Sequence, residues 1–173
     1  MKRLLFLFVY LFSLIISHGQ NTSVKQMVDS LKYLKHDTLD CKADLYWRIV
    51  AQGDKAIPFL IDKLNDTTQT NVSFHCKQSK LSVGELSYFA LNQIGDFPAF
   101  TITHIQFDEI DNNGCWSFYE YFFNNDNKPS YQRLVREWFN NNGKKFKVQK
   151  ISKKKQTNCQ KQFNIHTHYR WRE

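Results

Sequence analysis

Apolar residues at helical spacing dominate the first half of the chain and favour a mainly α fold. Residues 23–35 place apolar side chains three and four positions apart, as one face of an amphipathic helix does. The same spacing predicts helices within residues 39–50 and 55–64, and Gly53 between them suits the left-handed conformation that commonly ends a helix. Three amphipathic helices in succession predict a domain built from packed helical hairpins.

Helices are also expected in the middle of the chain. Ser82, followed three residues later by Glu85, is the pattern of a capping box and predicts a helix that runs to Ile94. Residues 99–110 combine β-branched residues with an Asp and Pro entry, and we favour a helix over a strand there. A polar turn is expected at residues 111–114, followed by helices in segments 116–123 and 130–139.

The C-terminal segment differs in composition from the rest. Residues 144–173 contain ten Lys or Arg and one Glu, whereas residues 20–143 contain twelve basic and fifteen acidic residues. Apolar and polar residues alternate from Phe163 to Arg172, which predicts a strand. We therefore expect a helical domain over residues 20–143, followed by a basic tail or a small β-hairpin over residues 144–173.

The first nineteen residues have the order of a secretory signal peptide. Lys2 and Arg3 precede an apolar run from Leu4 to Ile16, and small residues follow it. An uncleaved membrane anchor is the alternative interpretation, although the apolar run is short for a membrane span. No cysteine follows the run, so we expect no lipid anchor. The predicted localisation is exported, in the periplasm or secreted, after cleavage near Gln20.

Export determines how the cysteines are interpreted. Four thiols in an oxidising compartment can form two disulfides, with three connectivities that the sequence does not distinguish. Buried free thiols are the alternative. The candidate disulfide residues are Cys41, Cys76, Cys115 and Cys159.

Few residues point to a metal or to catalysis. His166 and His168 would share one face of a strand, as zinc ligands often do, but Arg170 and Arg172 on that face would repel a cation. A third ligand would have to come from elsewhere, such as His75 or His104. We interpret the acidic cluster Asp108, Glu109 and Asp111 as a solvated turn rather than a catalytic or calcium site. We expect no cofactor, because no common hydrolase or nucleotide-binding motif is present.

Aromatic residues are concentrated in one short segment. Most of them should be core, and some could form an exposed patch for a partner or a sugar. The cluster consists of Trp116, Phe118, Tyr119, Tyr121, Phe122 and Phe123.

Two segments resemble a repeat family. Residues 53–66 (GDKAIPFLIDKLND) are similar to the first helix and turn of a HEAT-type repeat, and residues 83–95 (VGELSYFALNQIG) resemble the second helix. The loop between them is longer than a standard repeat has, and no second copy follows at a fixed period. The resemblance therefore implies a HEAT-like helical domain rather than a solenoid, with a surface that is presented to partners.

Three functional hypotheses follow. The leading one is an exported, non-catalytic domain that binds a protein partner or serves as an envelope accessory. The second is a binder of an anionic envelope polymer or lipid surface through the basic tail, since export makes nucleic acid an unexpected partner. An enzyme of unrecognised class comes third. The candidate polyanion-binding residues are Lys144, Lys145, Lys147, Lys150, Lys153, Lys154, Lys155, Arg170 and Arg172.

Overall fold

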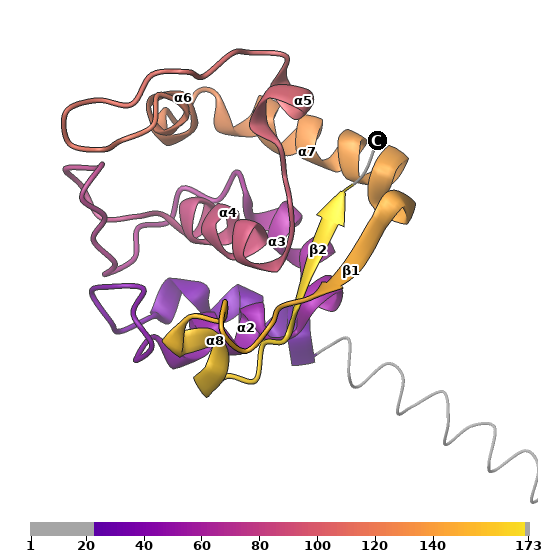
Figure 1. Cartoon of the computed structure of the whole chain (residues 1–173). Helices are drawn as coiled ribbons and strands as arrows, with labels where there is room; N and C mark the ends of the chain where they lie inside the picture. The colour runs from indigo at the N-terminus through magenta and orange to yellow at the C-terminus, as the bar shows by residue number, and fades with distance from the viewer. Residues whose placement is uncertain (1–22, 172–173) are drawn as a thin grey trace, which may run out of the picture.

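The computed structural model describes residues 23–171 and shows a mainly helical protein with a small antiparallel sheet (Figure 1). Residues 23–29 are helical, and the elements that follow are η1 (Ser30–Tyr33), α2 (Asp44–Val50), η2 (Gly53–Ala56), α3 (Ile57–Lys63), α4 (Val83–Ile94), α5 (Ala99–Thr103), α6 (Phe118–Phe123), α7 (Lys128–Asn142), η3 (Gly143–Lys145), β1 (Phe146–Lys150), α8 (Asn158–Gln162) and β2 (Thr167–Trp171). The predicted mainly α class with a C-terminal β-hairpin is confirmed.

The helices lie in layers around α3 and α4. Figure 1 shows α2 and α8 on one side of this pair and α5, α6 and α7 on the other, with the two strands along one edge. The predicted signal peptide, residues 1–19, lies outside the described residues. Within residues 23–171, no helix is both long enough and apolar enough to cross a bilayer.

The N-terminal helices bury the apolar faces that their spacing predicts. Val28 and Leu31 are fully buried, as are Ile49 and Leu60 further along. The helix predicted within residues 39–50 begins only at Asp44, because the preceding residues form a turn in which the Asp40 carboxylate accepts the Lys42 N–H. Gly53 has a φ of 60°, as predicted for a residue that ends a helix.

Helices α3 and α4 pack at very short range. The predicted capping box is present: Ser82 Oγ accepts the Glu85 N–H, and the Glu85 carboxylate accepts the Ser82 N–H. Glycine at position 84 permits the approach of the two helices, since a Cβ there would lie 2.4 Å from the Leu64 carbonyl oxygen. The two segments of the HEAT-like resemblance therefore contact each other directly, while the repeat assignment itself stays a prediction.

The stretch from residue 99 to residue 110 corrects one expectation. Helix α5 ends at Thr103, and His104 has a φ of 58°, so residues 104–110 are not helical. The Thr103 hydroxyl donates to the Ala99 carbonyl oxygen and accepts the Ile105 N–H. Such local bonding by a β-branched hydroxyl residue competes with continuation of the helix.

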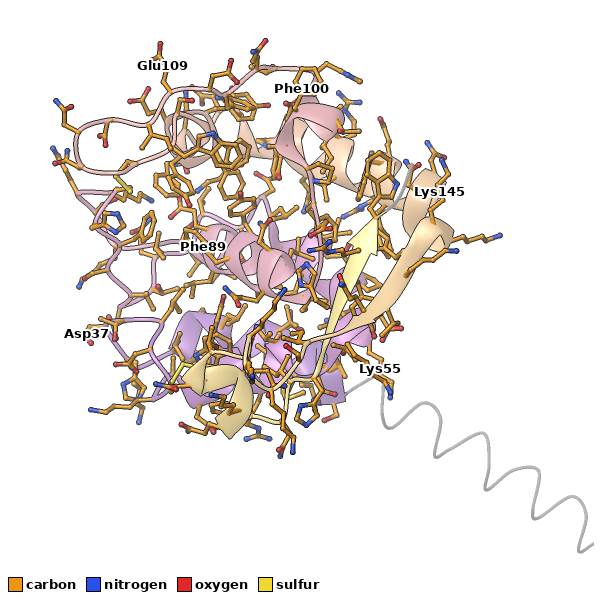
Figure 2. All side chains as sticks on the ribbon, in the orientation of Figure 1. Asp37, Lys55, Phe89, Phe100, Glu109 and Lys145 are labelled. Atoms are coloured by element: carbon orange, nitrogen blue, oxygen red, sulfur yellow. A yellow bond between two sulfur atoms is a disulfide. The ribbon has the colours of Figure 1, made fainter. Side chains whose placement is uncertain are left out.

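Aromatic side chains fill the space between α4, α6 and α7 (Figure 2). Phe118 and Phe122 are fully buried and stack on each other, and both contact Tyr88 and Tyr131. The remaining aromatics of the predicted cluster pack partly buried against the same core: Trp116, Tyr119, Tyr121 and Phe123. Two of the six residues, Phe118 and Phe122, thus belong to the buried core, and the other four cover it.

The two strands form a hairpin whose connection contains α8. Phe146 pairs with Trp171 and Lys150 with Thr167, so the strand predicted from Phe163 is shorter than expected. The strand begins only at Thr167, and residues 158–162, ahead of the predicted strand, form a helix after a capping box of Thr157 and Gln160. Phe146 and Trp171 pack on Trp138 of α7, and these contacts hold the hairpin against the helices.

Candidate functional site

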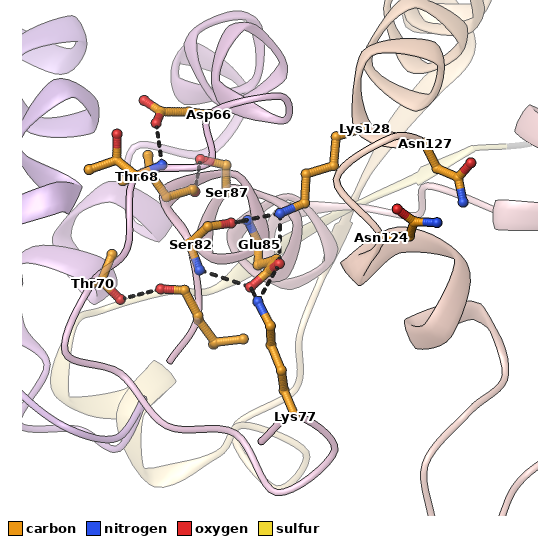
Figure 3. Close-up of polar contacts among 12 residues, drawn as sticks. Asp66, Thr68, Thr70, Lys77, Ser82, Glu85, Ser87, Asn124, Asn127 and Lys128 are labelled. Atoms are coloured by element: carbon orange, nitrogen blue, oxygen red, sulfur yellow. Dashed lines mark hydrogen bonds and ion pairs between the residues drawn. The ribbon is translucent and has the colours of Figure 1, made fainter. Parts of the chain in front are cut away.

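A buried polar cluster joins α4 to α7 (Figure 3). Lys128 Nζ lies 2.7 Å from Glu85 Oε1 and 3.0 Å from Ser82 Oγ. Lys77 Nζ also contacts both carboxylate oxygens of Glu85, at 2.8 and 2.7 Å. The capping box of α4 thus provides the carboxylate, and a lysine from the start of α7 neutralises it.

The geometry of this cluster fits a structural role. A serine hydroxyl beside a lysine amine is a pairing that some nucleophilic enzymes use. Here, however, the Lys128 ammonium donates to the Glu85 carboxylate, and the side chains of both residues have no solvent exposure. Ser82 is equally buried, so a substrate has no access to its hydroxyl. The cluster therefore stabilises the fold and does not act as a catalytic site.

The four cysteines form two disulfides, Cys41–Cys159 and Cys76–Cys115. The predicted pairing into two bonds is confirmed, and the structure supplies the connectivity. Such bonds are typical of an oxidising compartment. The first ties α8 to the segment before α2, and the second joins the loop of residues 65–80 to that of residues 104–117.

Histidines lie near potential ligands in three places. His75 has a ring nitrogen within 4.8 Å of the sulfurs of Cys76 and Cys115, but these sulfurs are bonded to each other and are not thiolates. His166 contacts the Gln156 amide at 2.7 Å, and His168 Nε2 lies 2.8 Å from Asp96 Oδ1. Within residues 23–171, neither His166 nor His168 belongs to a group of three converging metal-ligand side chains.

The acidic cluster after α5 organises a turn, as expected. The Asp111 carboxylate accepts the backbone N–H groups of Cys115 and Asn113, and these bonds hold the pKa of Asp111 below its usual value. Ile110 and Trp116 form a bridge across the turn, and the Trp116 indole donates to the Phe107 carbonyl oxygen. The turn is thus fixed by its own hydrogen bonds in addition to the disulfide.

An apolar surface with acidic neighbours results from this turn. Phe100, Ile105 and Ile110 are 60%, 42% and 69% exposed. Phe100 also lines a cavity of about 270 Å³, together with Gln106, Phe107, Asp108 and Trp116. Phe100 and Glu109 lie along the same edge of the molecule in Figure 2. We call Phe100, residues 105–111 and Trp116 the acidic aromatic face.

The charged side chains of the face itself are all acidic, whereas His75 and Lys77 line an adjacent pocket with Asp111 and Trp116. Residues 81–127 contain no Lys or Arg and seven Asp or Glu residues. Three of the seven belong to the acidic aromatic face, namely Asp108, Glu109 and Asp111, and all three are exposed. The sequence analysis named the acidic cluster and Trp116 for separate reasons. It did not identify Phe100 as a surface residue, because only the fold brings α5 beside the turn.

The opposite charge is concentrated on the hairpin. The predicted polyanion-binding lysines are all exposed, on η3, on β1 and in the turn after β1, and Arg170 is exposed on β2. Arg172 lies outside the described residues. The fold does not gather all of these residues. A cavity of about 380 Å³ includes Lys150, Lys155 and Arg170, and the candidates at positions 144, 145, 147, 153 and 154 do not line it.

Comparisons of this chain with protein-family models, with curated protein sequences and with solved structures found no match. The functional conclusion therefore depends on the geometry of the surfaces described above.

Proposed function

We propose that this protein is an exported, non-catalytic domain that binds a protein partner through the acidic aromatic face. The observation that carries the proposal is the exposure of Phe100 and Ile110, together with a cavity that Phe100 lines with Phe107 and Trp116. Large apolar side chains gathered on a surface are a common mark of a protein-binding site. Aromatic residues are also the anchors that contribute most of the affinity in protein interfaces.

The acidic aromatic face is ordered in the unbound protein. The disulfide Cys76–Cys115, the Asp111 turn and the bond from Trp116 to Phe107 fix the loop that carries it. A surface that is already ordered loses little conformational entropy on binding. This rigidity favours recognition of a partner over a role as a flexible linker.

The charge of the face specifies the chemistry of the partner. Asp108, Glu109 and Asp111 are exposed, and no Lys or Arg occurs in residues 81–127. Complementary charge speeds association and excludes partners of the same sign. The partner segment should therefore present an apolar side chain to the cavity, with Lys or Arg residues on either side of it.

Peptide titrations monitored by NMR test this proposal. Peptides with a central Leu-Phe pair flanked by lysines should cause saturable shifts at Phe100, Ile110 and Trp116. The same peptides flanked by glutamates should not bind. Absence of saturable shifts with the lysine-flanked peptides, or shifts that map elsewhere, would contradict the proposal.

Matched variants locate the binding. The double substitution Phe100→Ser and Ile110→Ser should weaken binding at least about tenfold, which corresponds to about 1.4 kcal/mol of binding free energy. The burial of two large apolar side chains contributes more than this. Tyr33→Ser is the control, since Tyr33 is as exposed as Ile110 but lies outside the face. An equal loss of binding in the control would contradict the assignment to this face.

A further inference from the structure

We infer that the cavity beside the hairpin is a binding groove for the acidic groups of a polysaccharide. This hairpin groove has a volume of about 380 Å³, within the range of about 300–1,000 Å³ that is usual for small-ligand sites. Its lining residues are Gln149, Lys150, Ile151, Ser152, Lys155, Thr157, Gln160, His168 and Arg170. Three of them carry a permanent positive charge, and none is acidic.

The three cations are available to a ligand. Within residues 23–171, no carboxylate forms a salt bridge with Lys150, Lys155 or Arg170. His168 differs, because its ring already contacts Asp96 at 2.8 Å. The anion site therefore consists of two ammonium groups and one guanidinium, and the guanidinium can bind a carboxylate or sulfate in a bidentate manner.

The hairpin itself concentrates like charge at this point. Lys147 stands directly opposite Arg170 in the register of the two strands. Like charges at directly opposed positions destabilise a strand pair. A bound anion would reduce this repulsion, so ligand binding and hairpin stability should be coupled.

The neutral residues of the groove favour a sugar as the carrier of the acid. Gln149, Ser152, Thr157 and Gln160 supply amide and hydroxyl groups that can exchange hydrogen bonds with sugar hydroxyls. Gln160 Oε1 accepts the Thr157 N–H, which leaves the Nε2 hydrogens without an acceptor among the described residues. No Phe, Tyr or Trp side chain lines the groove, so the usual stacking platform of a single-stranded nucleic acid site is missing from its described lining.

The walls of the groove are fixed in place. Gln156 is buried, and its amide donates to the Ile165 carbonyl oxygen, which closes the turn between β1 and α8 onto the residues before β2. The Cys41–Cys159 disulfide anchors α8 to the helical body. The cations therefore have fixed positions. Substitutions inside the groove should weaken binding more than substitutions outside it.

Calorimetric titration of the exported protein tests this inference. The probes are polygalacturonate for carboxylates, dextran sulfate for sulfates, polyphosphate as an acid without sugar, and neutral dextran. One of the two acidic polysaccharides should bind saturably and more tightly than polyphosphate, and neutral dextran should not bind. If neither acidic polysaccharide binds, or if polyphosphate binds as tightly, the inference is wrong.

Two double variants with the same change of charge identify the site. Lys155→Gln with Arg170→Gln removes two groove cations and should raise the Kd at least about tenfold, because two donors of charge-assisted hydrogen bonds are lost. Lys144→Gln with Lys153→Gln lies outside the groove and should change the Kd less than about threefold. Equal weakening of binding by both double variants would show that the attraction is diffuse and would contradict the assignment of binding to the groove.

Folding and the partner-binding surface need separate controls. Lys155→Gln alone alters an exposed turn residue and should raise the Kd even if the double variant does not fold. The Phe100→Ser and Ile110→Ser variant should bind the polysaccharide normally, because both residues lie on the acidic aromatic face. A parallel loss in that variant would show that the groove is not the site.

Discussion

Lys128, at the start of α7, forms an ion pair of 2.7 Å with Glu85 in the first turn of α4, and both side chains are completely buried. The pair connects residues that are 43 positions apart in the chain. It holds α7 against α4, and α7 in turn supports both the aromatic core and the hairpin. The pair therefore contributes to the support of the aromatic core and of the hairpin.

Replacement of Lys128 by methionine should lower the free energy of unfolding by about 1.5–3 kcal/mol, because it removes a buried charged hydrogen bond to Glu85, while Lys77 still pairs with the carboxylate. Arg133→Met is the matched control: it removes an exposed pair with Glu137 and should cost less than about 1 kcal/mol. Urea denaturation followed by circular dichroism measures both values. A Lys128→Met protein as stable as the control would contradict the role given to the pair.

Three buried tyrosines should make the protein unfold in alkali. Burial raises the pKa of Tyr46, Tyr88 and Tyr131 above the ordinary value of 10.0. Above pH 10 the unfolded chain loses these phenol protons while the folded protein keeps them, so stability falls as the pH rises. Each phenol should contribute a loss of about 1.4 kcal/mol per pH unit, measured by urea titrations between pH 9 and pH 12.

Tyr131→Phe provides the control for this titration. The Tyr131 hydroxyl is buried and has no hydrogen-bond partner among the described residues. Removal of this hydroxyl should leave the free energy of unfolding at pH 7 unchanged or raise it by up to about 3 kcal/mol. It should also reduce the alkaline slope by about 1.4 kcal/mol per pH unit. An unchanged slope would show that Tyr131 ionises in the folded state.

The two disulfides should differ in their effect on stability. The Cys41–Cys159 bond spans 118 residues and the Cys76–Cys115 bond spans 39. Loop-closure entropy predicts that removal of the longer bridge, by serine substitution of both cysteines, costs about 1 kcal/mol more than removal of the shorter one. Thermal unfolding of the two variants measures the difference, and mass spectrometry of unreduced peptides checks the pairing. Peptides that link Cys41 to Cys76 or Cys115 would contradict the structure.

Export is tested independently of the fold. N-terminal sequencing of protein collected from the periplasm or the medium should begin at or near Gln20. Recovery of the protein with Lys2 and Arg3 still attached to a membrane fraction would favour the uncleaved anchor instead.

Local signals in the sequence predicted much of the fold. The Ser82 and Glu85 capping box involves residues three apart, and the apolar spacing of the first helices needs no distant partner. Helix α8 has a similar signal in Thr157 and Gln160, which lie three residues apart ahead of the predicted strand. Signals of this kind depend on neighbours within one turn of chain, so the sequence displays them directly.

The candidate surfaces needed the tertiary structure. Nothing near Lys128 distinguishes it from an exposed lysine, because its partner Glu85 lies on another helix. Pairing among four cysteines has three solutions that local sequence does not rank. Phe100 and Trp116 were likewise separate in the sequence, and the end of α5 at Thr103 brings the loop back so that both line one cavity.

The most direct test of the proposed partner surface is site-specific photo-crosslinking in the cells that make this protein. A photoreactive amino acid at position 110 should capture a partner whose crosslinked peptide contains apolar residues next to Lys or Arg. The same amino acid at position 33, which is equally exposed but outside the acidic aromatic face, should capture nothing specific. No adduct at position 110, or the same adducts at both positions, would contradict the proposed function.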